Sequence, residues 1–94
     1  MVQPEKARST VRIYLDILKT AIEEGNAKPT RILQKANLSY DRLVKHLADL
    51  QKLRLLEEVK DGDSRYYTIT AKGRAFVNEA ERAQSFLSAF GVSI

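Results

Sequence analysis

The sequence predicts a mainly α-helical domain with one small β-hairpin, and three observations carry this prediction. Apolar residues recur at helical spacing in four stretches, at about 10–24, 30–36, 40–53 and 71–90. Two β-prone runs within 55–69 flank a glycine-containing turn and indicate a hairpin. A chain of 94 residues with 44% hydrophobic content has the size and apolar content of a single domain, 1–94.

The first expected helix runs from about Thr10 to Glu24. Ser9 or Thr10 can cap its start by accepting a bond from a free backbone N–H group. Ile13 and Ile17 widen its apolar face, so we expect it to touch more than one neighbour. Gly25 and Asn26 end it, because both tolerate the left-handed conformation of a helix stop.

The second expected helix is short, from about 30 to 36, and a tight turn separates it from the third. Pro29 or Thr30 opens it and Asn37 closes it. Leu38 is expected to point inward and to set the angle between the two helices.

Ser39 is the expected N-cap of the third helix, which runs to about Leu53. One side is apolar and is expected to dock on the first helix, leaving the polar side exposed. The apolar side carries Tyr40, Leu43, Val44, Leu47 and Leu50, and the polar side Asp41, Arg42, Lys45, His46, Asp49 and Lys52.

The hairpin is expected from two strands, 55–60 and 65–69, with the turn at 61–64. Leu56 and Val59 do not alternate regularly, which leaves a bulge or a short strand open. Thr70 then caps a long last helix over about 71–90. Its apolar seam is spaced like a heptad repeat: Phe76, Ala80, Ala83, Leu87 and Phe90.

Two helices joined by a short turn and followed by a hairpin predict a winged helix-turn-helix with a long C-terminal dimerisation helix. Within it, residues 9–69 are expected to form the DNA-binding core and 70–90 the dimerisation helix. The whole chain carries a formal net charge of +4, but the excess of positive charge lies in one segment. Residues 28–54 hold seven cations and two acids, whereas the remainder holds nine cations and ten acids. This distribution is the footprint expected of a protein that binds a polyanion.

The second helix of such a unit enters the major groove of double-stranded DNA. Several residues keep a second interpretation. Tyr40 is expected to be half-buried, Ser39 and Thr30 also suit helix capping, and Arg42 and Lys45 could be ordinary solvated charges. Asp41 and Asp49 would repel phosphate, so they are expected to face away or to pair with Lys45 and Lys52. The candidate DNA contacts are Lys28, Thr30, Arg31, Ser39, Tyr40, Arg42, Lys45, His46 (expected to be exposed), Lys60 and Arg65.

The hairpin is the weaker contact element, because Asp61 and Asp63 occupy its tip. Lys60 and Arg65, on its strands, are therefore the expected phosphate contacts, and a purely structural hairpin is the alternative. The last helix outruns a core this small, so its far end would be exposed unless a second chain covers it. The candidate dimerisation residues of a homodimer are Ala80, Ala83, Phe86, Leu87 and Phe90.

Composition excludes several other classes of function. The chain has no cysteine and one histidine, so disulfides, thiolate metal sites and multi-histidine metal sites are excluded. No cofactor, small-molecule ligand, membrane partner or catalytic constellation is evident, so we do not expect an enzyme. The polar N-terminus has no signal-peptide segment, and a reducing, cytoplasmic and nucleoid-associated location is expected.

Two segments carry a family resemblance: the run 38–57, with leucines at 38, 43, 47, 50, 53, 55 and 56, and the run 67–74, Tyr-Thr-Ile-Thr-Ala-Lys-Gly-Arg. They resemble archaeal winged helix-turn-helix proteins, and the layout is similar to the ten-kilodalton archaeal chromatin proteins. MarR-like and PadR-like regulators are looser relatives. The resemblance implies DNA contacts from the third helix and the wing, and an antiparallel coiled-coil dimer through the last helix. A transcription regulator and an architectural chromatin protein both remain open, and the alternative is a protein-interaction module that does not bind DNA.

Overall fold

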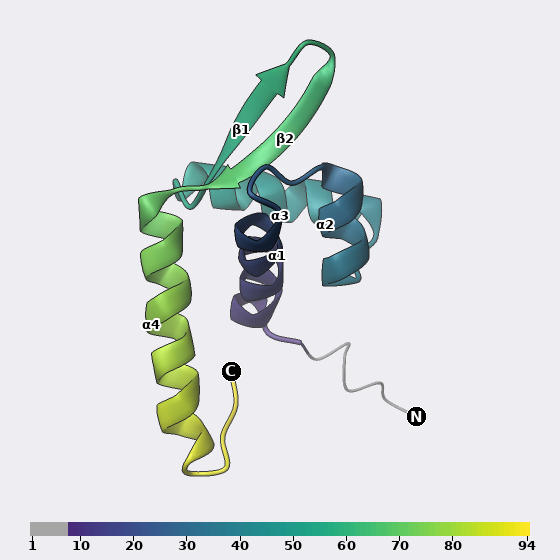
Figure 1. Cartoon of the computed structure of the whole chain (residues 1–94). Helices are drawn as coiled ribbons and strands as arrows, with labels where there is room; N and C mark the ends of the chain where they lie inside the picture. The colour runs from purple at the N-terminus through teal and green to yellow at the C-terminus, as the bar shows by residue number, and fades with distance from the viewer. Residues whose placement is uncertain (1–7) are drawn as a thin grey trace.

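The computed structural model describes residues 8–94 and has four helices and an antiparallel hairpin (Figure 1). The elements in chain order are α1 (Thr10–Glu24), α2 (Pro29–Ala36), α3 (Tyr40–Lys52), β1 (Leu56–Asp61), β2 (Ser64–Ile69) and α4 (Ala71–Ser88). The hairpin projects from one end of the molecule, and α4 extends away from it in the opposite direction. The prediction of a mainly α-helical fold with a wing and a long last helix is confirmed.

Helix α1 is the centre of the core, because it contacts α2, β2 and α4. Ile17, Leu18 and Ala21 are fully buried, and Ile13 and Leu15 nearly so. Each fully buried Leu or Ile stabilises the fold by about 2 kcal/mol. The expectation that Ile13 and Ile17 let this helix touch several neighbours is confirmed.

Hydroxyl caps begin three of the helices. Ser9 Oγ accepts from the backbone N–H of Arg12 at 3.0 Å, Ser39 Oγ from Arg42 and Thr70 Oγ1 from Gly73. The interpretation of Thr30 as a cap is wrong. Helix α2 begins at Pro29 after Lys28, so Thr30 lies inside its first turn. The fixed φ of proline suits the first helical position and makes a side-chain cap dispensable.

The turn between α2 and α3 has the predicted form. Asn37 takes the left-handed conformation, with φ 54°. The Leu38 N–H donates to the Leu33 carbonyl at 3.1 Å, and the Leu38 side chain is buried. The core therefore fixes the angle between the two helices through Leu38.

The hairpin is regular, so the bulge considered for it is wrong. Its register runs without interruption from Leu56 opposite Ile69 to Asp61 opposite Ser64, leaving a two-residue loop. Gly62, at φ 63°, is the first residue of that loop, where tight hairpin turns favour glycine. The far edge of β2 is also paired: Tyr67 N–H donates to the Ala27 carbonyl and Ala27 N–H to the Tyr67 carbonyl. This bridge ties the wing to the loop before α2, and no pattern in the sequence predicts it.

Helix α4 ends at Ser88, two residues before the predicted end. Gly91 takes the left-handed conformation, with φ 76°, and Val92 N–H donates to the Leu87 carbonyl at 3.0 Å. Glycine just beyond a helix favours such a stop. Phe90 therefore lies past the helix, and the expectation that it continues the helical seam is wrong. The tail then turns back, and Ile94 N–H donates to Gln84 Oε1 (Figure 1).

Candidate nucleic-acid interface

Helix α3 has one buried face and one broad exposed face. Leu43, Leu47 and Leu50 are 0–5% exposed, so they fix the helix on the core. The exposed face carries Asp41, Arg42, Lys45, Ala48 and Lys52. The structure thus confirms that these leucines dock the helix and that four of the charged side chains remain in solvent, whereas Asp49, also assigned to the polar side, is half-buried.

Two residues assigned to the apolar side are instead exposed. Tyr40 is 63% exposed, so its expected half-burial is wrong, and Val44 is 47% exposed. Both lie on the flank of α3 that faces the wing, where they line a groove of about 190 Å³ together with Glu58 and Arg65. This groove separates the wing from α3, so Tyr40 and Val44 remain exposed to solvent.

His46 is not on the exposed face, and its expected exposure is wrong. It is half-buried, and its ring meets the Tyr14 ring edge-on, with 5.8 Å between centroids. Nδ1 is buried and has no hydrogen-bond partner within residues 8–94. Burial, and next the positive charge of Arg42, lower the pKa of His46. The lowered pKa favours the neutral imidazole near pH 7, which makes His46 a poor partner for a phosphate.

Of the two alternatives for the acids of α3, pairing with the lysines of the same helix is not observed. Among residues 8–94, neither Asp41 nor Asp49 forms an ion pair with Lys45 or Lys52. Asp49 instead accepts from the Tyr14 hydroxyl at 3.5 Å, and burial together with this carboxylate raises the pKa of Tyr14. Because α1 supplies a partner for Asp49, Lys45 is left available to a ligand.

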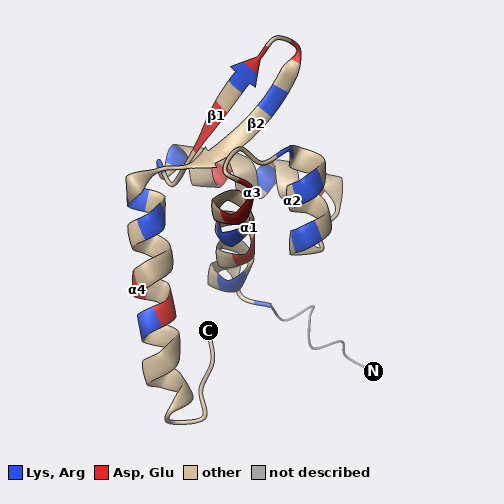
Figure 2. Ribbon diagram, viewed as in Figure 1, with Lys and Arg blue, Asp and Glu red and all other residues tan. Residues whose placement is uncertain are grey.

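The candidate cations fall into two sets (Figure 2). Two candidates pair with acids: Arg31 with Glu24 at 3.1 Å and Arg65 with Glu58 at 2.9 Å. Lys35, which lies in the basic segment but is not a candidate contact, pairs with Glu23 at 3.3 Å. Exposed pairs of this kind contribute about 0–1 kcal/mol, so a phosphate can displace the carboxylate at little cost. Four candidates are exposed and have no ion pair with residues 8–94: Lys28, Arg42, Lys45 and Lys60.

The wing presents both signs of charge. Lys60 and Arg65 lie opposite each other in the register, as the hairpin assignment implies. Asp61 and Asp63 lie beyond them at the exposed tip, which is red in Figure 2. The cations of the wing therefore sit on its strands, below an acidic end.

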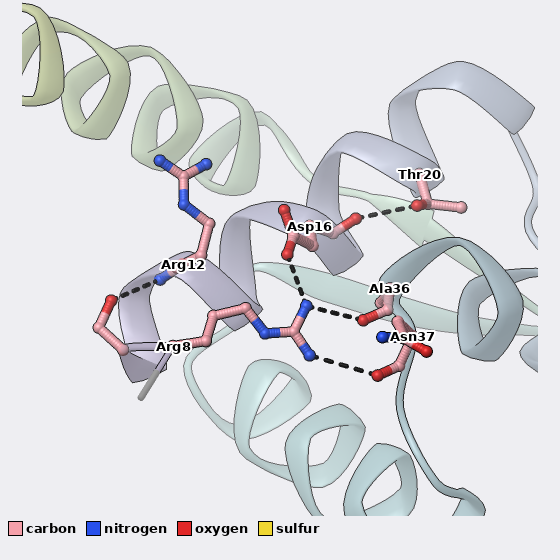
Figure 3. Close-up of polar contacts among 7 residues, drawn as sticks. Arg8, Arg12, Asp16, Thr20, Ala36 and Asn37 are labelled. Carbon is pink, nitrogen blue, oxygen red and sulfur yellow. Dashed lines mark hydrogen bonds and ion pairs between the residues drawn. The ribbon is translucent and has the colours of Figure 1, made fainter. Parts of the chain in front are cut away.

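Arg8 clamps the turn that leads into α3, and sequence reasoning missed it. Its Nη1 donates to Asp16 Oδ2 at 2.9 Å and to the Ala36 carbonyl at 2.8 Å, and its Nη2 donates to the Asn37 carbonyl at 3.3 Å (Figure 3). The carbonyls at the end of a helix lack partners within it, so this guanidinium satisfies two of them. No short-range pattern signals the contact, because Arg8 and Asn37 lie far apart in the sequence.

We expect Arg8→Ala to lower the free energy of unfolding by about 2 kcal/mol, because it removes charge-assisted bonds and leaves Asp16 unpaired. Urea unfolding followed by circular dichroism measures this loss. Arg12→Ala is the matched control, since its guanidinium points away from the turn in Figure 3. Equal losses in the two variants would show that Arg8 does not clamp the turn.

The far end of α4 is exposed, as predicted. Ala83 and Phe86 on the helix and Phe90 beyond it are exposed, whereas Ala80 and Leu87 are half-buried. The rings of Phe86 and Phe90 pack on each other with 5.3 Å between centroids, and Val92 adds to the apolar surface at 49% exposure. Phe76 and Val77, nearer the start of the helix, pack on the core.

Residues 8–94 contain no cluster of three or more potential metal ligands. Over the same range, no helix is both long and apolar enough to cross a membrane.

Comparison with known proteins places these features in a family. The family model described as winged helix-turn-helix matches residues 7–88. No curated protein matches the chain. The structure of Sso10a-2, a DNA-binding protein from Sulfolobus solfataricus, is similar at TM-score 0.80 and 28% identity, covering 88% of this chain and 85% of that one.

Longer proteins share the fold. A MarR family protein from Bacillus stearothermophilus matches at TM-score 0.69 and 18% identity, over 95% of this chain and 59% of that one. A mutant of ZitR from Lactococcus lactis, in complex with DNA, matches at TM-score 0.68 and 18% identity, over 97% of this chain and 64% of that one. This chain thus spans about three fifths of the length of these two proteins. The family model matches most of this chain, which shows that the chain belongs to the winged helix-turn-helix family.

Proposed function

We propose that this chain binds double-stranded DNA, with α3 in the major groove. The observation that carries the proposal is the exposed face of α3, where Arg42 and Lys45 have no ion pair with residues 8–94. The major groove is about 12 Å wide and admits a helix with its side chains. The similarity to Sso10a-2, described as a DNA-binding protein, supports the same conclusion.

Around α3, the proposed phosphate contacts come from α2 and the wing. Lys28, Thr30 and Arg31 surround the start of α2, where free N–H groups and the helix dipole favour an anion. Lys60 and Arg65 would contact phosphates from the strands, below the acidic tip. Ser39 and Tyr40 would face the duplex at the start of α3. His46 is not proposed as a DNA contact, because it is half-buried against Tyr14.

The chain is also proposed to act as a homodimer. The exposed apolar end of α4 (Ala83, Phe86 and the adjoining Phe90) supports it, and Ala80 and Leu87 border this surface. A two-fold dimer would present two copies of α3 to half-sites about one helical turn apart. In the proposed dimer, residues 9–69 bind DNA and residues 70–90 form the contact between the two protomers.

We expect Phe86→Asp to weaken the dimer at least about tenfold, because burying a charge opposes the apolar contact that the ring provides. Sedimentation equilibrium measures the change in the dimerisation constant. Lys72→Asp, an exposed position near the start of α4, is the control and should leave dimerisation unchanged. An unaltered dimer in Phe86→Asp, or a monomeric wild type, would contradict this interface.

A salt-titrated binding assay tests the function. Fluorescence anisotropy would compare random-sequence duplex with the DNA upstream of the chain's own gene, from about 50 to 200 mM salt. Binding that falls steeply with salt supports the proposal. Strong discrimination between the duplexes indicates a transcription regulator, and weak discrimination a nucleoid-associated chromatin protein. No binding at low salt would refute the proposal.

The alternative is a protein-interaction module with the same fold. The acidic wing tip, Asp61 and Asp63, favours it, because carboxylates at that point repel phosphate. Replacing both by asparagine separates the two functions. The substitution should strengthen DNA binding if the wing lies near the duplex, whereas a protein-interaction module would bind no duplex with or without it.

A further inference from the structure

An apolar ridge runs along the flank of α3 that faces the wing, next to the charged outer face of the helix. Tyr40, Val44 and Ala48 are spaced four residues apart, so they lie in one line on the helix, and all three are exposed. Tyr40 and Val44 are 63% and 47% exposed, respectively. We call these three residues the α3 ridge. Nothing in the core of residues 8–94 accounts for apolar side chains at these positions, since the leucines on the other face already fix the helix.

The surroundings of the ridge indicate what covers it. The ridge lines the groove between α3 and the wing, which Arg65 lines as well. Lys45 is exposed next to the ridge on the same helix, whereas Arg42 is exposed on the other flank. A partner protein with a purely apolar surface would remove these cations from water without supplying an opposite charge. A partner that is anionic at its edges and carries small apolar groups between them fits both features.

The major groove of DNA is such a partner. Its phosphates flank the groove, and within it thymine presents a C5-methyl group, which apolar side chains recognise. Phosphate contacts position a protein, and contacts to base edges specify sequence. The branched side chain of Val44 has restricted χ1 freedom, so its methyl groups are held in place before binding.

We infer that the α3 ridge reads thymine methyl groups, with Val44 as its central contact. The inference rests on the proposed DNA binding and goes beyond it, because it states which feature of the duplex α3 selects. It assigns the cations to affinity and the ridge to sequence preference.

The test compares two duplexes of equal length, one of alternating adenine and thymine and one with uracil in place of every thymine. The two share phosphates and base hydrogen-bonding groups and differ only in the methyl. Wild type should bind the thymine duplex about fourfold more tightly, the factor expected when one methyl group is buried. Val44→Ala should lose most of this preference, because it removes the methyl groups of the central contact. Its salt dependence should stay that of wild type, because no phosphate contact is lost.

Leu53→Ala is the matched control. Leu53 is 48% exposed at the end of α3, outside the ridge, so this variant should discriminate as wild type does. Circular dichroism verifies that each variant is folded. If wild type binds both duplexes equally, the ridge inference fails while DNA binding stands. If Val44→Ala prefers thymine as strongly as wild type does, the ridge is not the reader, and if neither duplex binds, the proposed function fails as well.

Discussion

A chain with both Arg42 and Lys45 replaced by alanine is expected to bind duplex DNA about 100-fold more weakly at about 0.1 M salt. Each cation that neutralises a phosphate releases condensed counterions, which is worth about a factor of ten in affinity at that salt. Both side chains are exposed on α3 and have no ion pair with residues 8–94, so little is lost within the protein when they are removed.

The salt dependence makes this prediction specific. The slope of log K against log salt should become shallower by about 1.8, because two phosphate contacts are gone. Anisotropy titrations at several salt concentrations measure it. Arg74→Ala with Arg82→Ala removes the same charge from exposed positions of α4 and is the matched control. If both double variants weaken binding equally, net charge explains the affinity and α3 is not the contact element.

The sequence predicted the fold well where the signals are local. Helix α1 begins and ends where Ser9 and Gly25 place its caps, and Leu38 is buried as the turn requires. Such signals are local because a cap or a helical period depends on residues within a few positions. The end of α4 shows two local signals in conflict: the apolar spacing extends to Phe90, but the stop at Gly91 prevails.

The parts of the candidate site that the sequence did not predict depend on tertiary contacts. Tyr40 and His46 lie on opposite flanks of α3, and periodicity cannot say which flank a neighbour covers. Tyr14 of α1 covers His46, whereas the wing leaves Tyr40 exposed. Arg8 likewise reaches the end of α2 across 28 positions of sequence.

Gly73 is where α4 meets the base of the wing, and its missing side chain decides how closely they pack. A Cβ atom at this position would collide with the Leu55 carbonyl oxygen and lie 2.7 Å from Ile69 Cγ1. The Leu55 carbonyl cannot move freely, because it accepts from the Thr70 N–H at 3.2 Å and from the Thr70 hydroxyl. The same hydroxyl caps α4. An added methyl group would therefore strain the cap, the junction and the helix together.

Two effects of Gly73→Ala oppose each other, and their magnitudes decide the outcome. Alanine is the better helix former by about 1 kcal/mol, whereas overpacking against a fixed backbone costs about 3 kcal/mol. We therefore expect a net loss of about 2 kcal/mol in the free energy of unfolding, measured by urea denaturation. Lys72→Ala, next to it and exposed, should change stability by less than about 0.5 kcal/mol. A Gly73→Ala protein as stable as wild type would contradict this prediction and would mean that α4 can shift away from the base of the wing. This junction would then not fix the spacing of the two α3 helices in a dimer.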